Sequence, residues 1–348
     1  MDIFAFMVSG TATVLEALQQ LDNNGHGILF LCEDERIKGV VSDGDVRRYM
    51  LRNGDMGCAV SKIANYHPYA IAMDAHVDSQ KFMREKQITA LPIIDKRGRI
   101  IRIDFDNGVK VFRTLDEAVP VVIMAGGKGS RLYPYTNILP KPLIPIGDKT
   151  ITEHIMERFE QVGCNRFYMV VNYKKNLIRT FFQETGRKED IRFVDEETFL
   201  GTGGGLRLLL GKVEGTFFMT NCDILVEEDY RLMLEYHREH HNIATMICAK
   251  KEVEMPYGTV ETDEEGRAVS LSEKPRFRFL TNTGLYVLEP EFLERIPEDT
   301  FIHITDVIQD CIDRGERVGV YTVGEEAWLD MGQMDELHRM KRKLEMER

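Results

Sequence analysis

The sequence predicts an α/β protein of two domains, the larger built on a mostly parallel sheet with helices on both faces. Three observations support this fold class. From Val119 onward, apolar segments with strand character alternate with segments whose apolar residues recur at helical spacing. A glycine-rich segment follows the apolar run Val119–Met124 directly, as it would at the carboxyl end of a strand. The residues before Val119 contain a degenerate internal repeat, which indicates a separate unit.

The N-terminal repeat consists of two copies of helix, strand, charged turn and strand. The segment Ile28–Ile37 aligns with Leu91–Ile100 at an offset of 63 residues. In the first copy we expect a helix from Val14 that stops at Gly25, because apolar residues recur at helical spacing before that glycine. We place this α/β domain at residues 1–112 and expect its two copies to bury each other's apolar faces.

The second domain is expected at residues 119–348. The polar segment Asp106–Ala118 predicts a linker or a short helix, and we place the linker at residues 113–118. Beyond it, the pattern predicts, among other elements, a strand at Phe167–Val171 and a helix at Glu228–His240.

Composition narrows the class of partner. The chain has 348 residues and a formal net charge of −12, which argues against nucleic acid as the ligand. It has no basic run of five residues and no apolar run near the length of a membrane span, so we expect no membrane partner. Met1–Gly10 does not resemble a signal peptide.

Six cysteines without a C-x-x-C pair favour free thiols in the cytoplasm over disulfides.

The most informative segment is Ala125-Gly-Gly-Lys-Gly-Ser-Arg-Leu132 followed by Leu139-Pro-Lys-Pro-Leu-Ile-Pro145. Its glycines let backbone N–H groups approach phosphate oxygens without a Cβ clash. Arg131 and Lys141 can neutralise the charge that develops during phosphoryl transfer. The spacing is not that of a P-loop, and the glycine fingerprint of dinucleotide binding is missing. The segment therefore predicts a site for a nucleoside triphosphate.

Residues Ala125–Gly147 resemble the signature of the sugar-nucleotide pyrophosphorylases, or sugar-1-phosphate nucleotidylyltransferases. The resemblance covers Val119–Leu337, and Ser130 stands where that family usually has Thr. It implies a Rossmann-like sheet of the GT-A type and a Mg²⁺-dependent transfer of a nucleoside monophosphate from an NTP to a sugar 1-phosphate, with release of pyrophosphate. The implied nucleotide-binding residues are Ala125, Gly126, Gly127, Gly129 and Ser130, and the implied catalytic cations are Arg131 and Lys141.

Two aspartates match the Mg²⁺ ligands of that family. Asp223 follows an apolar strand within Met219–Leu225, and Asp330 lies in Trp328–Gly332. Hard carboxylate oxygens suit Mg²⁺, and the substrate phosphates would complete its shell. The residues alone leave other roles open: Asp223 as the N-cap of a following helix, and Asp330 as a capping residue beside a core tryptophan.

Phe199–Leu206 resembles the family's Leu-Gly-Thr element, which lines the nucleobase pocket. The resemblance implies that Gly201 and Thr202 bind the base. Because three glycines at a helix start are costly to order, Gly203–Gly205 suggest close approach of a ligand. The alternative is a glycine-rich helix start that has no ligand.

The acidic run Asp195-Glu-Glu197 precedes this element. One carboxylate can accept both the N1–H and N2–H groups of guanine, whereas it would repel the carbonyl oxygens of uracil. We therefore expect Glu196 or a neighbour to favour GTP. A solvated acidic loop is the alternative.

Further segments resemble the family's sugar-phosphate site. In Ser272–Pro275, the resemblance implies that Glu273 bonds sugar hydroxyls and that Lys274 pairs with the sugar phosphate and serves catalysis. Gly258 and Asn282 match two sugar-lining elements. An exposed lysine in a loop is otherwise a solvated side chain.

The N-terminal repeat resembles a tandem pair of cystathionine-β-synthase-type (CBS) domains. Ser42 and Asp45 stand where that family holds the ribose of an adenosyl ligand, and Phe105 and Gly108 replace them in the second copy. The resemblance implies an adenosyl nucleotide effector and a homo-oligomer formed through the pair. The alternative is a packing or dimerisation module without a ligand, with Asp45 in the first turn of a helix.

Three alternatives to a GTP-dependent enzyme stay open at this stage. The first is the same reaction with UTP, dTTP or CTP. The second is a non-catalytic scaffold that senses nucleotides through a dead transferase-like domain. The third is transfer to phosphocholine or a similar small phosphate on the same fold.

Overall fold

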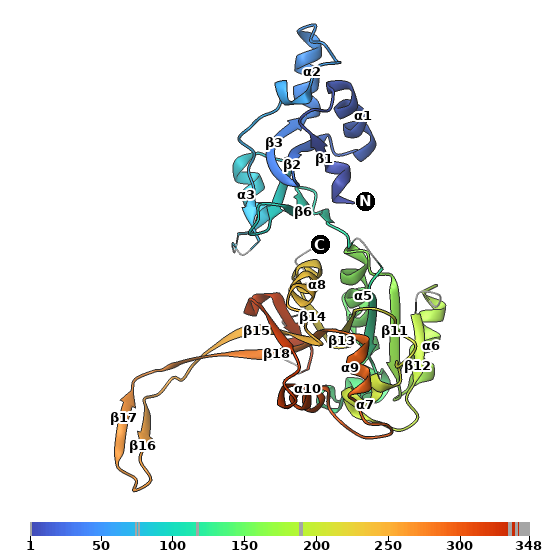
Figure 1. The fold of residues 1–348 in the computed structure, drawn as a ribbon, viewed down its shortest axis with the longest axis vertical. Coiled ribbons are helices and arrows are strands. Elements are labelled where there is room, and N and C mark those ends of the chain that lie inside the picture. The colour runs from blue at the N-terminus through green and yellow to red at the C-terminus, as the bar shows by residue number, and fades with distance from the viewer. Residues whose placement is uncertain are drawn as a thin grey trace. The chain divides into compact units, whose positions relative to one another are not determined.

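The computed structural model describes residues 2–73, 75, 77–115, 118–187, 191–332, 336–337 and 340 (Figure 1). The chain divides into two compact units, the first formed by residues 1–116 and the second beginning at residue 117. Both sides of this boundary fall in the linker expected at residues 113–118, and residues 116 and 117 lie outside the described part of the chain.

The N-terminal unit contains two small sheets, of order β1-β2-β3 and β4-β5-β6-β7. The elements of the first copy are β1 (Met7–Ser9), α1 (Val14–Asn24), β2 (Ile28–Glu33), β3 (Arg36–Ser42) and α2 (Asp43–Leu51). Those of the second are β4 (Ile71–Ala72), α3 (Ser79–Lys86), β5 (Ala90–Ile94), β6 (Ile100–Phe105) and β7 (Lys110–Phe112). Helix α1 ends at Gly25, whose φ of 66° is the left-handed conformation that glycine adopts at low cost.

Strand register confirms the internal repeat. In the first hairpin Leu31 pairs with Gly39 and Cys32 with Ile37, so one residue of β3 is skipped. The β5–β6 hairpin skips one residue of β6 at the matching place. The two copies also share a core, to which the first contributes Phe30 and the second Phe105.

The segment after the second copy differs from the expectation. Residues Lys110–Phe112 form β7, an antiparallel partner of β6, so a linker or short helix is wrong for these residues. The chain reverses at Gly108, whose φ is 84°. Strand β6 would otherwise present an unpaired edge, and β7 supplies the missing backbone partners.

The second unit is built on a seven-stranded sheet of order β12-β11-β8-β13-β18-β15-β19. Strand β18 is antiparallel to both neighbours, and the remaining pairs are parallel. The sheet strands are β8 (Pro120–Met124), β11 (Arg166–Val171), β12 (Ile191–Asp195), β13 (Phe217–Asn221), β15 (Ala244–Glu254), β18 (Arg276–Leu288) and β19 (Val318–Val323). The mostly parallel α/β sheet expected from the sequence is confirmed.

Smaller strands and helices complete this unit. The short strands are β9 (Pro145–Ile146), β10 (Lys149–Thr150), β14 (Ile224–Val226), β16 (Thr259–Thr262), β17 (Ala268–Ser272) and β20 (Trp328–Asp330). The α-helices are α4 (Tyr135–Ile138), α5 (Ile151–Gln161), α6 (Lys175–Glu184), α7 (Gly201–Arg207), α8 (Tyr230–Glu239), α9 (Pro290–Glu294) and α10 (Ile304–Asp313). Single 3₁₀ turns cover Ser130–Leu132 and Lys141–Leu143.

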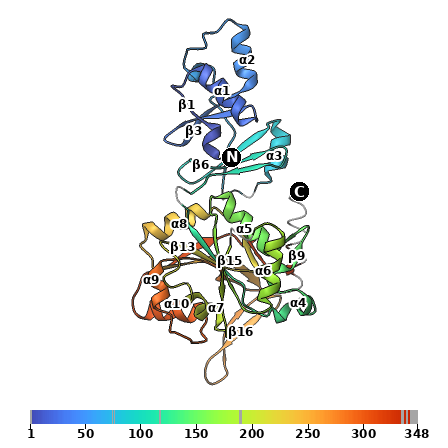
Figure 2. The ribbon, with the colours of Figure 1, turned by 90° about the vertical axis from the view of Figure 1, so that its right-hand side faces the viewer.

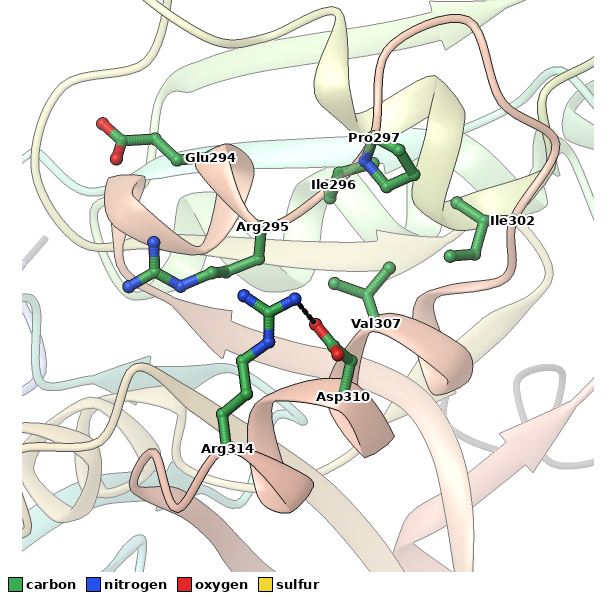
Figure 3. Close-up of a pocket in the computed structure, with 8 residues that line it drawn as sticks. All are labelled: Glu294, Arg295, Ile296, Pro297, Ile302, Val307, Asp310 and Arg314. Carbon is green, nitrogen blue, oxygen red and sulfur yellow. Dashed lines mark ion pairs between the residues drawn. The ribbon is translucent and has the colours of Figure 1, made fainter.

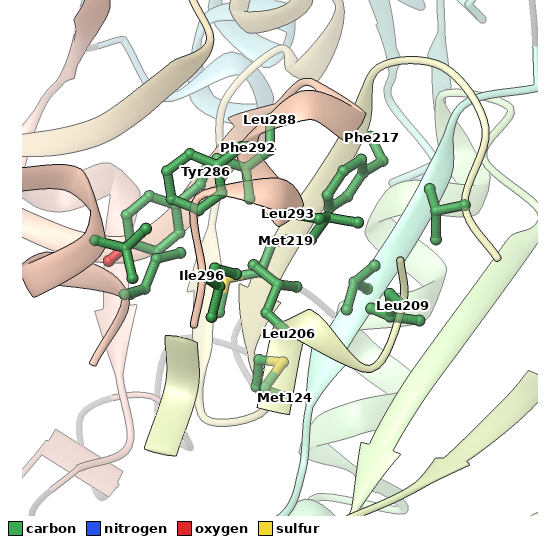
Figure 4. Close-up of a cluster of buried hydrophobic side chains, with 14 of the residues drawn as sticks. Met124, Leu206, Leu209, Phe217, Met219, Tyr286, Leu288, Phe292, Leu293 and Ile296 are labelled. Carbon is green, nitrogen blue, oxygen red and sulfur yellow. The ribbon is translucent and has the colours of Figure 1, made fainter. Parts of the chain in front are cut away.

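Helices cover both faces of the sheet (Figure 2). Alternate residues of β8 point to opposite faces. On one face, Val122 and Met124 join a core with residues of α7, α9 and α10 (Figure 4). On the other, Phe159 of α5 stacks on Tyr230 of α8 and contacts Phe218 of β13.

The strand order reverses at β8, since β11 and β12 extend the sheet to one side of it and β13 to the other. Open α/β sheets bind ligands at the carboxyl ends of the strands where such a reversal occurs. The segments after β8 and β13 are the glycine-rich segment and the one that holds Asp223. The fold therefore brings the two main sequence motifs to one crevice.

Strands β15 and β18 run well beyond the sheet. Their antiparallel ladder continues to the pair Glu254–Arg276, and the β16–β17 hairpin projects further still (Figure 1). Residues 250–280 are called the arm below. Most of their side chains are exposed.

The cysteines agree with the free thiols expected from the sequence. All six cysteines are free thiols, and four of them are buried. Within the described ranges, no helix is both long and apolar enough to cross a membrane.

Candidate active site

The glycine-rich segment leaves the sheet at the carboxyl end of β8. Ala125 and Gly126 are buried, whereas Gly127 and Ser130 are exposed. Gly129 has a φ of 66°, and its carbonyl accepts a hydrogen bond from the Thr136 hydroxyl at 3.0 Å. The segment is thus anchored at both ends and presents its middle to solvent, as a loop that cradles phosphates requires.

Lys141 and Asp223 form a buried ion pair in this crevice. The Lys141 ammonium donates to an oxygen of Asp223. Only 12% of the lysine side chain and 11% of the aspartate side chain are exposed. The sequence placed the two residues in one site with separate roles, and the structure brings them into direct contact.

Asp330 lies beside this pair. Strands β14 and β20 are antiparallel with Ile224 opposite Asp330, and the Met331 N–H donates to the Asp223 carbonyl at 2.8 Å. Burial raises the pKa of Asp330, and the negative charge of Asp223 raises it further. The Gly332 N–H, which donates to Asp330 at 2.6 Å, opposes this shift.

The charge of Arg131 also acts on the Asp330 carboxyl. The positive charges of Lys141 and Arg131 also work against the raised pKa of Asp330, so both cations are within electrostatic reach of that carboxyl. The Arg131 side chain belongs to an exposed residue. Lys141, Asp223 and Asp330 therefore lie together, and the catalytic and metal-binding roles of these residues and of Arg131 stay predictions. Asp223 does not cap the helix expected at Glu227–Tyr236, because the N-cap of α8 is Asp229.

Two adjacent, partly desolvated carboxylates fit a divalent cation. The charge of Asp223 disfavours the ionised form of Asp330, and a bound cation would offset this effect. No group of three or more His, Cys, Asp and Glu side chains that could hold a metal occurs among the described residues. A cation at Asp223 and Asp330 would thus need oxygens from the substrate, as Mg²⁺ commonly does at phosphate sites.

Cys222 precedes Asp223. Burial raises the pKa of its thiol to about 12, and the charge of Asp223 adds to this effect. The thiol is therefore protonated near neutral pH in the metal-free protein, which disfavours a nucleophilic role.

Glu196 is buried next to the glycine-rich segment rather than solvated. It is 3% exposed, and its Oε1 accepts a hydrogen bond from the Leu200 N–H at 2.8 Å. A Cβ on Gly126 would lie 2.6 Å from Glu196 Oε2. Burial raises the pKa of this carboxyl, and the Leu200 N–H lowers it in part. A solvated acidic loop is wrong for Glu196, whereas the side chain of Glu197 is 84% exposed.

The glycines that follow have a packing role. A Cβ on Gly201 would lie 2.6 Å from the Ile302 carbonyl oxygen, and one on Gly204 would lie 2.3 Å from that of Thr300. Gly201–Gly205 lie inside α7, so the chain's own backbone explains the small residues without a ligand. Thr202 accepts a hydrogen bond from the Ile304 N–H at 3.1 Å. Roles for Gly201 and Thr202 in base binding stay predictions.

Two residues of this site were missed from the sequence. The Asn172 amide donates to the Glu196 carbonyl at 2.7 Å, and Lys174 donates to the carbonyls of Asn137 and Ile138 beside the glycine-rich segment. Both follow the apolar run of β11. The reasoning applied to Asp223, that polar residues at a strand's carboxyl end face the ligand, would have found them.

The residues predicted to bind the sugar phosphate lie in two places, near the sheet and on the arm. Asn282 lies in β18 close to the sheet, where its side chain bonds the Tyr286 hydroxyl at 2.7 Å. Gly258, Glu273 and Lys274 are exposed on the arm. A Cβ on Gly258 would lie 3.0 Å from Glu273 Oε2, so these residues face each other. They are assembled locally, but the arm does not bring them to the site at β8.

In the N-terminal unit, Ser42 and Asp45 form the capping box of α2. The Asp45 carboxylate accepts from the N–H and the hydroxyl of Ser42 at 2.9 and 2.6 Å, and it pairs with Arg48. Partial burial opposes ionisation, but the bonds from Ser42 and Arg48 lower the pKa of Asp45. The structure thus shows Ser42 and Asp45 in the helix-capping role that was the alternative. Phe105, in the second copy, is a core residue.

A cavity of about 480 Å³ lies between α9 and α10 (Figure 3). Its charged groups pair locally: Arg314 with Asp310 at 2.8 Å and Arg295 with Glu316 at 2.7 Å. None of the residues expected in the site lines it.

Comparison with known proteins agrees with this geometry. The family model for nucleotidyl transferases matches residues 120–347. The chain belongs to the nucleotidyl transferase family. The model for the CBS domain matches residues 2–52, the first of the two N-terminal copies. Nucleotidyl transferases of this family generally depend on a divalent metal ion.

The relatives cover the second unit. The chain is 30% identical over 228 residues to a mannose-1-phosphate guanylyltransferase of Mycobacterium tuberculosis, which covers 64% of this chain and 63% of the relative. It is 29% identical to the catalytic subunit beta of that enzyme from Drosophila pseudoobscura pseudoobscura, over 63% of this chain and 61% of the relative. It is 32% identical to the bifunctional protein GlmU of Methanococcus vannielii, over 61% of this chain and 51% of the relative. The chain thus spans between half and two thirds of these relatives.

The fold is also that of a solved structure. The crystal structure of HddC from Yersinia pseudotuberculosis matches 65% of this chain and 99% of its own, with a TM-score of 0.52 and 24% identity.

The packing of α7 gives a test of the glycine run. Substitution Gly204→Ala should lower the free energy of unfolding by about 1–3 kcal/mol, because the added methyl meets the Thr300 carbonyl. Urea denaturation measures this change. Gly127→Ala is the control, since a Cβ there meets nothing within 4 Å. A gain in stability for Gly204→Ala, as expected at an unhindered helical glycine, would show that α7 does not need this close approach.

Proposed function

We propose that this protein transfers a nucleoside monophosphate from an NTP to a sugar 1-phosphate, releasing pyrophosphate, and that GTP is the preferred NTP. The observation that carries the proposal is the cluster of Lys141, Asp223 and Asp330 beside the glycine-rich segment, with the buried Glu196 on its other side. Guanylyltransferases and GlmU among the relatives support the same class of reaction.

The chemistry needs no protein nucleophile. The sugar phosphate already carries a charged oxygen that can attack the α-phosphorus in line, so catalysis consists of positioning and charge stabilisation. The N–H groups of Gly127–Ser130, in a segment of mostly exposed residues, would hold the triphosphate together with Arg131. A charge on Lys141 stabilises the α-phosphate as negative charge moves onto the pyrophosphate.

Asp223 and Asp330 would hold Mg²⁺. When bound, the ion would supply a Lewis acid. Asp223 would also keep the Lys141 ammonium in the site through the ion pair between them. Because this pair is mostly shielded from water, its charges act strongly on a bound phosphate.

Glu196 would read the base. Of the described groups, the Leu200 N–H is the one that donates to its carboxylate, and burial has raised its pKa. The two donors of a guanine edge would supply the hydrogen bonds that a buried carboxylate needs. Uracil would present a carbonyl oxygen to the same group. UTP and dTTP are therefore disfavoured at this position, whereas this argument does not exclude CTP, because cytosine presents an amino group in place of that carbonyl.

The scaffold alternative requires a site that has lost its charged groups. Arg131, Lys141, Asp223 and Asp330 are all present and clustered. An adenosyl nucleotide at Ser42 and Asp45 is a separate prediction, and this proposal does not depend on it.

The experiment that tests the proposal is pyrophosphate release with Mg²⁺, using five NTPs against a panel of hexose, hexosamine and heptose 1-phosphates. Turnover with GTP and at least one sugar phosphate is expected. Turnover with UTP or dTTP alone would keep the reaction and refute the role of Glu196. Absence of turnover with every pair, with and without adenine nucleotides, would favour the scaffold.

Asp223→Asn should lower kcat by roughly a thousandfold, because it removes a metal ligand and the partner charge of Lys141. The amide oxygen can still accept from Lys141, so the circular dichroism spectrum should be unchanged. Asp229→Asn is the control: Asn also caps a helix, and α8 and the turnover should survive. Comparable kcat values for Asp223→Asn and the wild type would remove Asp223 from the mechanism.

Glu196→Gln should reduce the ratio of kcat/KM for GTP over UTP by about tenfold to a hundredfold, the value of a hydrogen bond to a charged group. Glu197→Gln, at the exposed neighbour, should leave the ratio unchanged. Because burial raises the pKa of Glu196, the wild-type ratio should also fall as pH is lowered and the carboxylate takes up a proton. A ratio that is independent of both changes would assign base recognition elsewhere.

A further inference from the structure

The two faces of the arm differ sharply. Val253 lies opposite Phe277 in the β15–β18 ladder, and Phe279 follows two residues later on the same face. These side chains are 44%, 49% and 48% exposed. The opposite face carries ion pairs, from Arg278 to Glu252 at 2.6 Å and from Arg276 to Glu254 at 3.0 Å. This alternation is typical of a strand pair with one face buried and one in water.

The apolar residues continue into the β16–β17 hairpin. Val260 pairs with Leu271, and these side chains are 56% and 77% exposed. A two-stranded ribbon is marginally stable by itself in water, and large exposed apolar surfaces mark sites of association. The arm therefore needs a partner for its apolar face.

The geometry of the ladder keeps the arm off the site of its own chain. Asn282 lies near that site, because Gly284 approaches Asn221 closely at the end of β13. From Asn282 the ladder runs without a break to Arg276, which places Lys274 on the order of 20 Å further along the strand direction. To return, the ribbon would have to give up these backbone pairs. One chain thus holds the metal carboxylates and the sugar-phosphate residues apart.

The rim of the site exposes apolar side chains that could receive such a ribbon. Tyr133, Tyr135 and Ile138 follow the glycine-rich segment directly, and they are 67%, 44% and 78% exposed. Lys174 fixes this rim by donating to the carbonyls of Asn137 and Ile138. The chain therefore carries both an unpaired apolar ribbon and an apolar rim at a site that lacks the residues on that ribbon.

We propose that the arm docks on the site of a second copy of this chain, so that each site receives Glu273 and Lys274 from the other copy. The inference rests on the proposed function for the role of these two residues. A reciprocal exchange gives a closed two-fold dimer in which every arm is covered and every site is complete.

The test is complementation between two inactive variants of the full-length protein, Asp223→Asn and Lys274→Met. In a mixed dimer with exchanged arms, one site would contain both substitutions and the other neither. Equal co-expression should therefore recover about 25% of wild-type turnover, because half of the dimers are mixed and each has one intact site. If the arm serves its own chain, every site in the mixture lacks one residue. Activity no higher than that of the separate variants, with an active wild type, would overturn the proposal.

A measurement without substrate separates this inference from the proposed function. By sedimentation, the wild-type protein should be a dimer, and Phe277→Glu on the apolar face should yield monomers. Arg278→Gln, on the charged face of the same strand, should remain dimeric. A monomeric wild type would refute the docking of the arm even if no sugar phosphate supports turnover. A dimer unaffected by Phe277→Glu would refute the arm as the dimer contact and favour the N-terminal pair expected from the sequence. A dimer that dissociates on Phe277→Glu without any turnover would refute the function alone.

Discussion

The candidate site depends on one buried ion pair, between Lys141 and Asp223. Lys141 follows the glycine-rich segment, and Asp223 is 82 residues further along the chain. Asp223 comes after β13, which lies next to β8 in the sheet. Their contact is possible because β8 and β13 are parallel neighbours at the point where the strand order reverses. Removing either side chain altogether would leave the other charge buried without its partner, so this pair contributes to stability as well as to the predicted phosphate site. Asp330 joins through the β14–β20 ladder.

Local patterns predicted most of the fold. The alternation of strands and helices, the repeat of the first domain and the end of α1 at Gly25 each depend on residues close in sequence. The proximity of Lys141 and Asp223 also followed, since motifs at the carboxyl ends of parallel strands meet at one edge. Asp330 was assigned to the same place through the family resemblance alone. The nucleobase argument identified Glu196 but not its burial, which results from Gly126 and Gly205 on either side of the carboxylate.

Features that arise between distant segments could not be predicted. The run Gly203–Gly205 suggested a ligand. The carbonyl groups that approach Gly203 and Gly204 belong to residues about a hundred positions later, which the local sequence does not indicate. Strand β7 depends on an open edge of β6, which the pattern of Lys110–Phe112 does not reveal. The arm was missed for a similar reason: Glu273 and Lys274 match a binding motif, but only the register of β15 on β18 shows where that motif is held.

The capping box at Ser42 bears on how sequence motifs are interpreted. The same serine and aspartate, three residues apart, satisfy a helix start and would satisfy a ribose. A chain of this kind can lose its ligand without changing either residue, because the helix continues to need both. The motif therefore reports that a helix begins after the strand, and a second feature, such as an unengaged carboxylate oxygen, must distinguish a sensor from a structural module.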